Sequence, residues 1–430
     1  MSVFRVGSNK SSVNNFPSVR PTLDLDFANS KTLDPRITFT RASGGSYVGA
    51  DGLIKYAGVN EARFDHDPST GESLGLLIEE SRSNLVAYSD AITNSNLYSV
   101  VVATLTQVTT TTPISGLAIA TKVFLNIGAN AGNSINGFNF GVFSLTNSTV
   151  YTQSIFVKAS GSSVFRLRSN VTGQVFDIPI AGPAPTLTGT ITSCTVTPYP
   201  DGWSRISWTF TSTTSIPGNR GDHWVMKPNI ADGSSGFLVT GAQLEAGAFA
   251  TSYIPTEGST RTRAADNASI TGKNFSEWYR QDEGTVYADT KINGVQTTRY
   301  DRLWAITNAN FHFEGISIYS SGQGGNIYIF SISVTNSAIE QVDGSVPETA
   351  FTTPRLKSVF AIKQNNCAGA VNGQQRFVDS IVDLSSFTTP PDRLLIGQPQ
   401  RFQGTFCMTI SRLSYYPKRL PNAQLQALTK

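Results

Sequence analysis

The sequence predicts an all-β protein made of two β-sandwich (jelly-roll) domains in tandem, with a short N-terminal arm and one short C-terminal helix. Three observations lead to this prediction. Only 15% of the residues are charged, which is low for helices with solvated outer faces. Glycine is plentiful at 37 residues, and serine and threonine are abundant throughout. Short segments alternate apolar and polar residues, as half-buried strands do, and turn-forming residues separate them.

The first part of the chain divides into an arm and a β-rich segment. Residues 1–20 are polar and lack periodicity, so we expect an extended docking arm that is ordered only when a partner holds it. In residues 21–90 the segment LDLDF (23–27) alternates apolar and acidic residues. RITFTRAS and GLIKYAG follow, and the turn signals GG and ADG separate them. We assign residues 21–90 as a lead-in to the first domain.

Residues 91–262 contain the strands predicted for the first sandwich. Four segments can each place one apolar face inward: VYTQSIFVKAS, SVFRLRSN, WSRISWTFTS and GFLVTGAQLE. The turn signals ASGSS, PYPDG and ADGSSG fall between them. Several strands at this spacing are typical of a sandwich or jelly roll.

The polar, Gly/Thr-rich residues 263–274 are the predicted linker, and residues 275–430 are the predicted second sandwich. GTVYADTKI, GNIYIFSISV, RLKSVFAIK, DRLLIGQ and GTFCMTISRLSYYP all have strand-like patterns. The chain ends in LPNAQLQALTK, where Asn422 can cap a short helix whose Leu425 and Leu428 pack back on the sheet.

Composition also argues against several classes of function. The formal net charge is +3 and the basic residues are scattered, so we expect no nucleic-acid partner. The sequence has no signal-peptide pattern and no window suited to spanning a bilayer, so we expect synthesis in a cytoplasm and no membrane insertion. The three cysteines form no CxxC unit, and no metal-ligand spacing involves the three histidines. We expect no cofactor, and no structural calcium ion is indicated.

The stretch RFDHDPSTGESLGLLIEE (63–80) carries the densest group of acids. It invites comparison with a calcium-binding EF-hand, but its glycine is one place late and Leu76 stands where the bidentate glutamate belongs. DPSTG instead has the composition of a β-turn, so we favour a hairpin corner over the alternative of a cation site.

Glu79 and Glu80 follow the apolar run in this stretch. Adjacent residues of a strand point to opposite faces, so these two acids cannot face one substrate as a glycosidase requires. We expect one of them to bond Arg82 or Arg41 instead. Because no nucleophile elbow or phosphate-binding loop occurs either, we assign no catalytic residues and predict that the protein is not an enzyme.

Aromatic residues supply the candidate ligand-binding site. Trp224 follows Asp222 and His223 in GDHWVMK near a loop, and Tyr199 is a further large ring, so these four are the predicted glycan-binding residues. In WSRISWTF, Trp203 and Trp208 are five residues apart and should point to opposite faces of one strand, so we expect at most one of them in the core.

Two parts of the sequence resemble known modules. LDLDF, RITFTRAS and YVGADGLIKYAGVNEARFDHDPSTGESLGLLIEESRSNLVAYSD resemble a segment that recurs in virion proteins of tailed bacteriophages, where it precedes a jelly roll like that of carbohydrate-binding modules. PDGWSRISWTFTS and TGAQLEAGAFATSYIPTEGSTRTRAAD resemble the later strands and closing segment of that module. Residues 275–430 resemble a concanavalin A-like (laminin-G-type) sandwich, with VNGQQR (371–376) as its characteristic turn.

The resemblance implies an exposed virion component, such as a tail fibre, head fibre or spike, that displays two sandwiches and binds host-surface polysaccharide. It also implies attachment to other virion proteins, which we assign to residues 1–20, and we favour a homotrimer. The alternatives are a purely structural decoration or joining protein that binds no glycan and, third, a polysaccharide depolymerase. The strand of alternating acids found in glucanases on the concanavalin-like scaffold is missing from this sequence.

Overall fold

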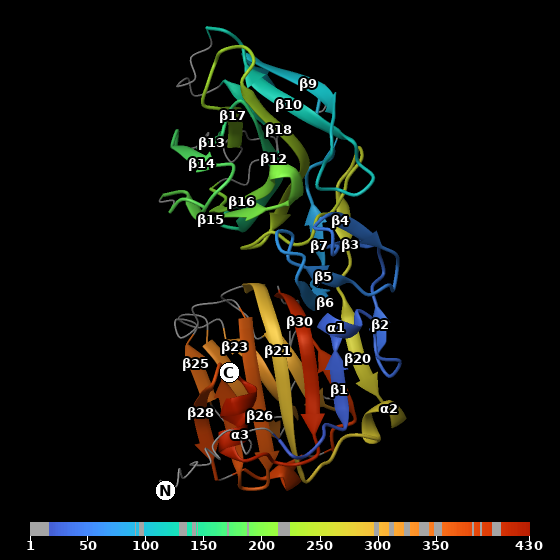
Figure 1. Cartoon of the computed structure of the whole chain (residues 1–430). Coiled ribbons are helices and arrows are strands. Elements are labelled where there is room, and N and C mark those ends of the chain that lie inside the picture. The colour runs from blue at the N-terminus through green and yellow to red at the C-terminus, as the bar shows by residue number, and fades with distance from the viewer. Residues whose placement is uncertain are drawn as a thin grey trace, which may run out of the picture. The chain divides into compact units, whose positions relative to one another are not determined.

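The computed structural model describes residues 17–90, 92–93, 99–128, 136–139, 143, 145–169, 172–186, 189–213, 224–295, 301–308, 314–321, 327–334, 344–347, 355–380, 382–387, 389–397 and 406–430. It confirms the all-β class, with antiparallel sheets and few, short helices (Figure 1). The chain forms two compact units. The first unit comprises residues 39–266 and 293–296, and the second comprises residues 1–38, 267–292 and 297–430. In the described part of the chain, no helix is both long enough and apolar enough to cross a membrane.

Two antiparallel sheets form the sandwich of the first unit. The six-stranded sheet has the order β15 (Ile191–Pro198), β16 (Trp203–Thr211), β12 (Val150–Ser160), β18 (Gly236–Ala246), β10 (Ile119–Leu125), β9 (Ala103–Thr109). The five-stranded sheet has the order β14 (Val175–Pro179), β13 (Val164–Ser169), β17 (Trp224–Pro228), β11 (Gly137–Asn139), β8 (Ser99–Val101). Apolar side chains from both sheets share one core, in which Phe165 from β13 packs against Trp208 from β16.

A third layer covers the other face of the six-stranded sheet. It is the hairpin of β3 (Gly45–Val48) and β4 (Ile54–Ala57), whose Val48 and Ile54 pack in one cluster with Trp203. Trp203 and Trp208 therefore point to opposite faces, as predicted. The expectation that at most one of them is core is wrong, because the hairpin buries the face that carries Trp203 and both side chains are at most 1% exposed.

The acid-rich stretch forms the predicted hairpin corner. Its two strands, β5 (Phe64–His66) and β6 (Ser73–Glu79), pair antiparallel. The Asp67 carboxylate accepts a hydrogen bond from the Thr70 backbone amide at 3.0 Å, and Gly71 has a φ of 71°, which glycine adopts readily. Among the described residues, no group of three or more acidic, histidine or cysteine side chains is arranged to hold a metal ion.

The second unit is also built of antiparallel sheets. One contains β28 (Gln374–Asp379), β27 (Cys367–Val371), β26 (Arg355–Lys363), β21 (Glu283–Val295), β30 (Phe406–Tyr416) and, on β30, β1 (Leu23–Asp26). The other contains β20 (Asn267–Thr271), β29 (Arg393–Ile396), β22 (Asp301–Thr307), β23 (Glu314–Ser321), β24 (Ile327–Val334) and β25 (Gly344–Pro347). The remaining short elements belong to both units. They are α1 (Phe27–Ser30), β2 (Thr38–Thr40), β7 (Arg82–Asn84), β19 (Arg261–Arg263), α2 (Lys273–Ser276) and 3-10 turns at Pro200–Gly202 and Leu384–Ser386.

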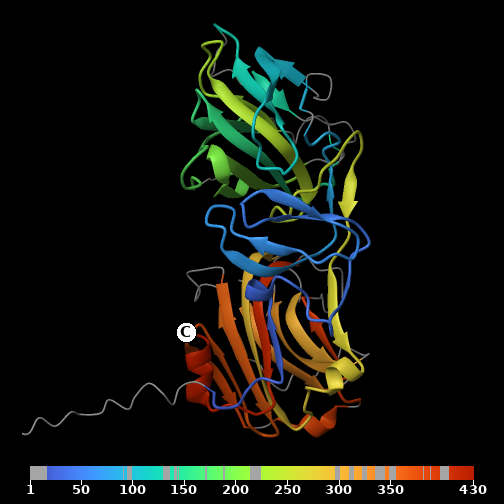
Figure 2. The same cartoon turned by 45° about the vertical axis from the view of Figure 1, so that its right-hand side comes forward.

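The C-terminal elements of the second unit agree closely with those predicted from the sequence. Helix α3 (Asn422–Leu428) lies against the sheet that contains β26 and β27 (Figure 2). Its Leu425 is fully buried, and Leu428 packs beside it. Asn422 is the first helical residue and Pro421 takes the capping position, so the predicted cap is displaced by one residue. Asn372 and Gly373 both have positive φ, as a type I′ turn between β27 and β28 requires.

The division between the units differs in two respects from the predicted domain limits. Strand β1 pairs with β30, so its residues lie in the second unit and not in a lead-in to the first domain. The units divide between Asp266 and Asn267, inside the predicted linker 263–274. That segment is ordered, because it contains β20 and the start of α2. Of the predicted arm, only residues 17–20 lie within the described residues.

Candidate functional site

A buried ionic cluster joins four distant parts of the first unit. Arg63 donates to Glu79 at 2.7 Å and also to Asp266, Arg41 donates to Asp266 at 3.0 Å, and Arg263 lies 3.4 Å from Glu79. All five side chains are at most 1% exposed. Three guanidinium groups face two carboxylates, so the ionic cluster holds one positive charge in excess.

The local structure brings these side chains together. Arg63 immediately precedes β5, Glu79 is the last residue of β6, and Arg263 is the last residue of β19. Asp266 also accepts the backbone amide of Glu79 at 2.8 Å, and its own amide donates to the Glu79 carbonyl at 2.9 Å. The cluster therefore ties the acid-rich hairpin to the end of the first unit.

Ionisation of Glu79 is opposed by burial and favoured by its arginine partners. Burial alone would raise the pKa of this carboxyl, but the charges of Arg263 and Arg63 and the hydrogen bonds from Ser252 outweigh it and hold the pKa well below its usual value. Burial likewise opposes the charge of Arg63, while Asp266 and Glu79 raise its pKa. Both groups are therefore ionised in the folded protein.

Acid should weaken the contribution of Glu79 to stability. The folded pKa is depressed, so the contribution is complete above the unfolded value of about 4.3 and is lost as the pH falls towards the folded value, by about 1.4 kcal/mol per pH unit. We expect Glu79→Gln to lower the free energy of unfolding strongly near neutral pH and less at about pH 3. Denaturant titrations of both proteins at each pH measure this difference, and an equal loss at the two pH values would contradict it.

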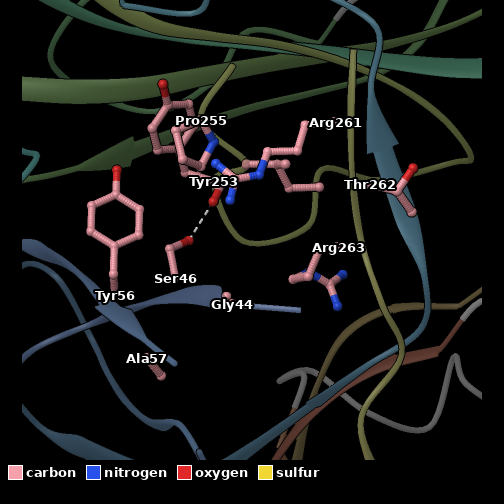
Figure 3. A pocket seen from close by; sticks show the side chains of 11 residues that line it. Gly44, Ser46, Tyr56, Ala57, Tyr253, Pro255, Arg261, Thr262 and Arg263 are labelled. Atoms are coloured by element: carbon pink, nitrogen blue, oxygen red, sulfur yellow. Dashed lines mark hydrogen bonds between the residues drawn. The ribbon is translucent and has the colours of Figure 1, made fainter. Parts of the chain in front are cut away.

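A pocket of about 370 Å³ lies beside the ionic cluster (Figure 3). Its walls come from the β3–β4 hairpin, from the segment around Tyr253 and from β19. The lining residues are Gly44, Gly45, Ser46, Tyr56, Ala57, Tyr253, Ile254, Pro255, Arg261, Thr262 and Arg263. The pocket and the ionic cluster share Arg263, so the charged groups form part of the wall.

Two side chains in the pocket are open to a ligand. Tyr56 is 46% exposed, and Arg261 is also exposed. Figure 3 shows Arg261 extending from β19 towards the side of the pocket where Tyr56 stands. Partial burial and the charge of Asp90 raise the pKa of Tyr56, while the nearby Arg261 lowers it. Within the described residues neither side chain has a hydrogen-bond or ion-pair partner.

Other polar groups of the pocket are already engaged. The Ser46 hydroxyl donates to the Tyr253 carbonyl at 2.5 Å, which links the hairpin to the opposite wall (Figure 3). The Tyr253 hydroxyl donates to Asp90 at 2.5 Å. Thr262 shares a hydrogen bond with Ser83 at 2.7 Å. These contacts hold the walls in place and leave Tyr56 and Arg261 as the adaptable groups.

Of the predicted glycan-binding residues, the structure describes Tyr199 and the backbone of Trp224, and neither is a lining residue of the pocket. Tyr199 is 9% exposed and packs edge-on against Phe156 at a ring distance of 5.1 Å, so its ring lies in the core beneath the β3–β4 hairpin. Trp224 is the first residue of β17, opposite Ser169. Asp222 and His223 lie outside the described residues.

The prediction missed Tyr56 and Arg261. One available signal was the pattern RTR at the end of the first unit, because alternate residues of a strand share a face and Arg261 and Arg263 are therefore neighbours. No comparable signal marks Tyr56, since its exposure depends on which strands surround β4. Glu80 does bond Arg82, one of the two partners predicted for the glutamate pair.

Comparisons with known proteins give limited likeness. No family model matches the sequence, and no curated protein matches it. Among solved structures, a receptor binding domain has 13% identity over 38% of this chain and 39% of that chain, with a TM-score of 0.31. The binding domain of botulinum neurotoxin DC in complex with rat synaptotagmin II has 13% identity over 38% and 40%, with a TM-score of 0.32. The CBM40 of Ruminococcus gnavus IT-sialidase, bound to α2,3-sialyllactose, has 17% identity over 34% and 82%, with a TM-score of 0.28.

This chain thus spans about two fifths of the length of the first and second of these structures. At such TM-scores the likeness supports no assignment of function. The fold itself defines the class, which is an all-β protein of sandwich units.

Proposed function

We propose that this protein is a bacteriophage virion component whose first unit binds a glycan on the host surface. The observation that carries the proposal is the pocket in which the exposed Tyr56 ring stands near Arg261, which has no partner among the described residues. Binding sites for small ligands combine apolar and aromatic surface with a few placed polar groups, and a pocket of about 370 Å³ falls within their usual range.

The pocket chemistry suits a sugar. A pyranose has an apolar face that can cover an aromatic ring, and hydroxyls that need hydrogen-bond partners. Tyr56 offers the ring, and Arg261 offers several donors in one plane. The sequence resemblance to phage virion proteins supports the same proposal, and it is the only support for a place on a virion.

Binding without catalysis is part of the proposal. A glycosidase needs two carboxyl groups on one side of a cleft. Glu79 is buried between Arg63 and Arg263, and Glu80 is paired with Arg82, so both adjacent glutamates are committed to arginines. None of the eleven lining residues that the structure describes is acidic.

Attachment and assembly complete the proposal. We assign contact with other virion proteins to residues 1–20 and favour a homotrimer. Weak binding of single sugars becomes useful when several copies are held on one particle, because linkage raises the effective concentration. A purely structural decoration protein is the alternative, and it would leave the pocket unused.

Truncation of Tyr56 tests the proposal. We expect Tyr56→Ala to weaken binding of the labelled full-length protein to bacterial host cells by about tenfold, because the ring is the main contact surface. Flow cytometry measures binding, and surface polysaccharide extracted from the same cells should compete with it. Tyr56→Phe keeps the ring and serves as the matched control. Binding that neither the polysaccharide nor Tyr56→Ala reduces would favour the structural alternative.

A further inference from the structure

We infer that the pocket takes a glycan unit that carries a carboxylate, such as a uronic or sialic acid, with the carboxylate held by Arg261. This inference rests on the proposed glycan binding, and it specifies in addition that the bound sugar is negatively charged. It follows from the electrostatics of the pocket wall, from one close approach of the backbone and from the exposed guanidinium of Arg261, which lacks a partner in the described part of the chain.

The wall of the pocket is positively charged. The ionic cluster holds three arginines and two carboxylates, and its Arg263 is itself a lining residue. The Arg263 Nη2 atom is buried and has no hydrogen-bond partner within the described structure. An excess charge in a buried site is weakly screened, so it acts on a ligand more strongly than a surface charge does.

Gly45 brings the pocket close to this charge. A Cβ atom placed on Gly45 would lie 3.2 Å from Arg41 Nε and 3.3 Å from Arg263 Cδ. The main chain of the β3–β4 hairpin therefore rests directly on the two arginine side chains, with no side chain between. A side chain at this position would meet both arginines, so glycine permits the close approach.

Arg261 supplies the direct contact. Its guanidinium is exposed and has no partner among the described residues, whereas the exposed Arg280 and Arg412 are each paired with an acid. A planar guanidinium matches the two oxygens of a carboxylate with two parallel hydrogen bonds. One free guanidinium balances one negative charge, which fits a monoanionic carboxylate.

Asp90, whose charge acts on Tyr56, does not line the pocket. Asp90 lies behind Tyr253, whose hydroxyl donates to it, and it is not a lining residue. Burial raises the pKa of Asp90, against the hydrogen bonds from Tyr253 and the Gly241 amide. All eleven lining residues lack a carboxylate.

A glycan array with matched probes tests the inference on the full-length protein. It carries neutral oligosaccharides, uronic-acid and sialic-acid oligosaccharides, the same acidic probes after chemical reduction of their carboxyl groups, and sulfated neutral oligosaccharides. We expect binding to carboxylated probes, and a loss of about tenfold or more on carboxyl reduction and in Arg261→Gln. Arg280→Gln removes the same charge from an exposed residue of the second unit and should leave binding unchanged.

The outcomes separate the two proposals. If neutral probes bind as well as carboxylated ones and Tyr56→Ala abolishes both, the glycan-binding function stands and the carboxylate assignment is overturned. Sulfated probes that bind as tightly as carboxylated ones also overturn the assignment. If the folded protein binds no probe at all, both proposals fail. Retention of the carboxylate preference in Arg261→Gln would show that this arginine is not the contact.

Discussion

Arg63→Met is expected to destabilise the first unit by about 3–5 kcal/mol, because it leaves two buried carboxylates short of a partner. Arg63 is the only member of the ionic cluster that contacts both Glu79 and Asp266. Without it, Glu79 keeps Arg263 at 3.4 Å and Asp266 keeps Arg41 at 3.0 Å. Methionine fills similar space but offers no charge, so the loss of pairing dominates over any loss of packing.

Denaturant unfolding combined with hydrogen exchange measures this effect and assigns it to residues 39–266. The matched control is Arg412→Met in the second unit, where the arginine pairs with Asp24 at 2.5 Å but is 45% exposed. Exposed pairs contribute about 0–1 kcal/mol, so this control should be nearly neutral. Equal effects of the two substitutions would contradict the view that the ionic cluster holds the first unit together.

A second variant separates charge from packing. Arg63→Met combined with Asp266→Asn removes both charged partners of one buried ion pair, so neither partner is left without the other. We expect it to cost less than the sum of the single substitutions, because the two side chains interact directly. Additive costs would show that the residues act independently.

Local patterns in the sequence were enough to predict several features of the fold. The Asp67–Gly71 turn and the buried face of α3 both depend on residues close together in the chain, whereas the turn at Asn372 and Gly373 was expected from the resemblance to a laminin-G-type sandwich. In these cases side-chain chemistry and backbone preference act over a few residues, so composition and periodicity reveal them.

Features that depend on distant pairing were not predicted. Asp266 meets Arg41 and Arg63 across 225 and 203 residues, and β1 pairs with β30 from the opposite end of the chain. The pocket has the same origin, since Tyr56 and Arg261 come from strands far apart in sequence. Alternation shows which residues share a face of a strand, but it does not show what covers that face.

The two tryptophans of β16 show this limit most directly, and their replacement gives the second large effect. We expect Trp203→Ala and Trp208→Ala each to lower the free energy of unfolding by about 3–5 kcal/mol, because both faces of the six-stranded sheet are covered. The β3–β4 hairpin covers Trp203, and the five-stranded sheet covers Trp208.

Phenylalanine substitutions distinguish the two sites further. The indole Nε1 of Trp203 donates to the Thr111 carbonyl at 3.0 Å, whereas Trp208 Nε1 has no partner within the described structure. Trp203→Phe should therefore cost about 1 kcal/mol more than Trp208→Phe, since it alone removes a hydrogen bond. Denaturant unfolding of the four variants measures these differences. If Trp203→Ala cost less than about 1 kcal/mol, as a surface substitution would, the hairpin that forms one wall of the pocket would not be packed on the sheet.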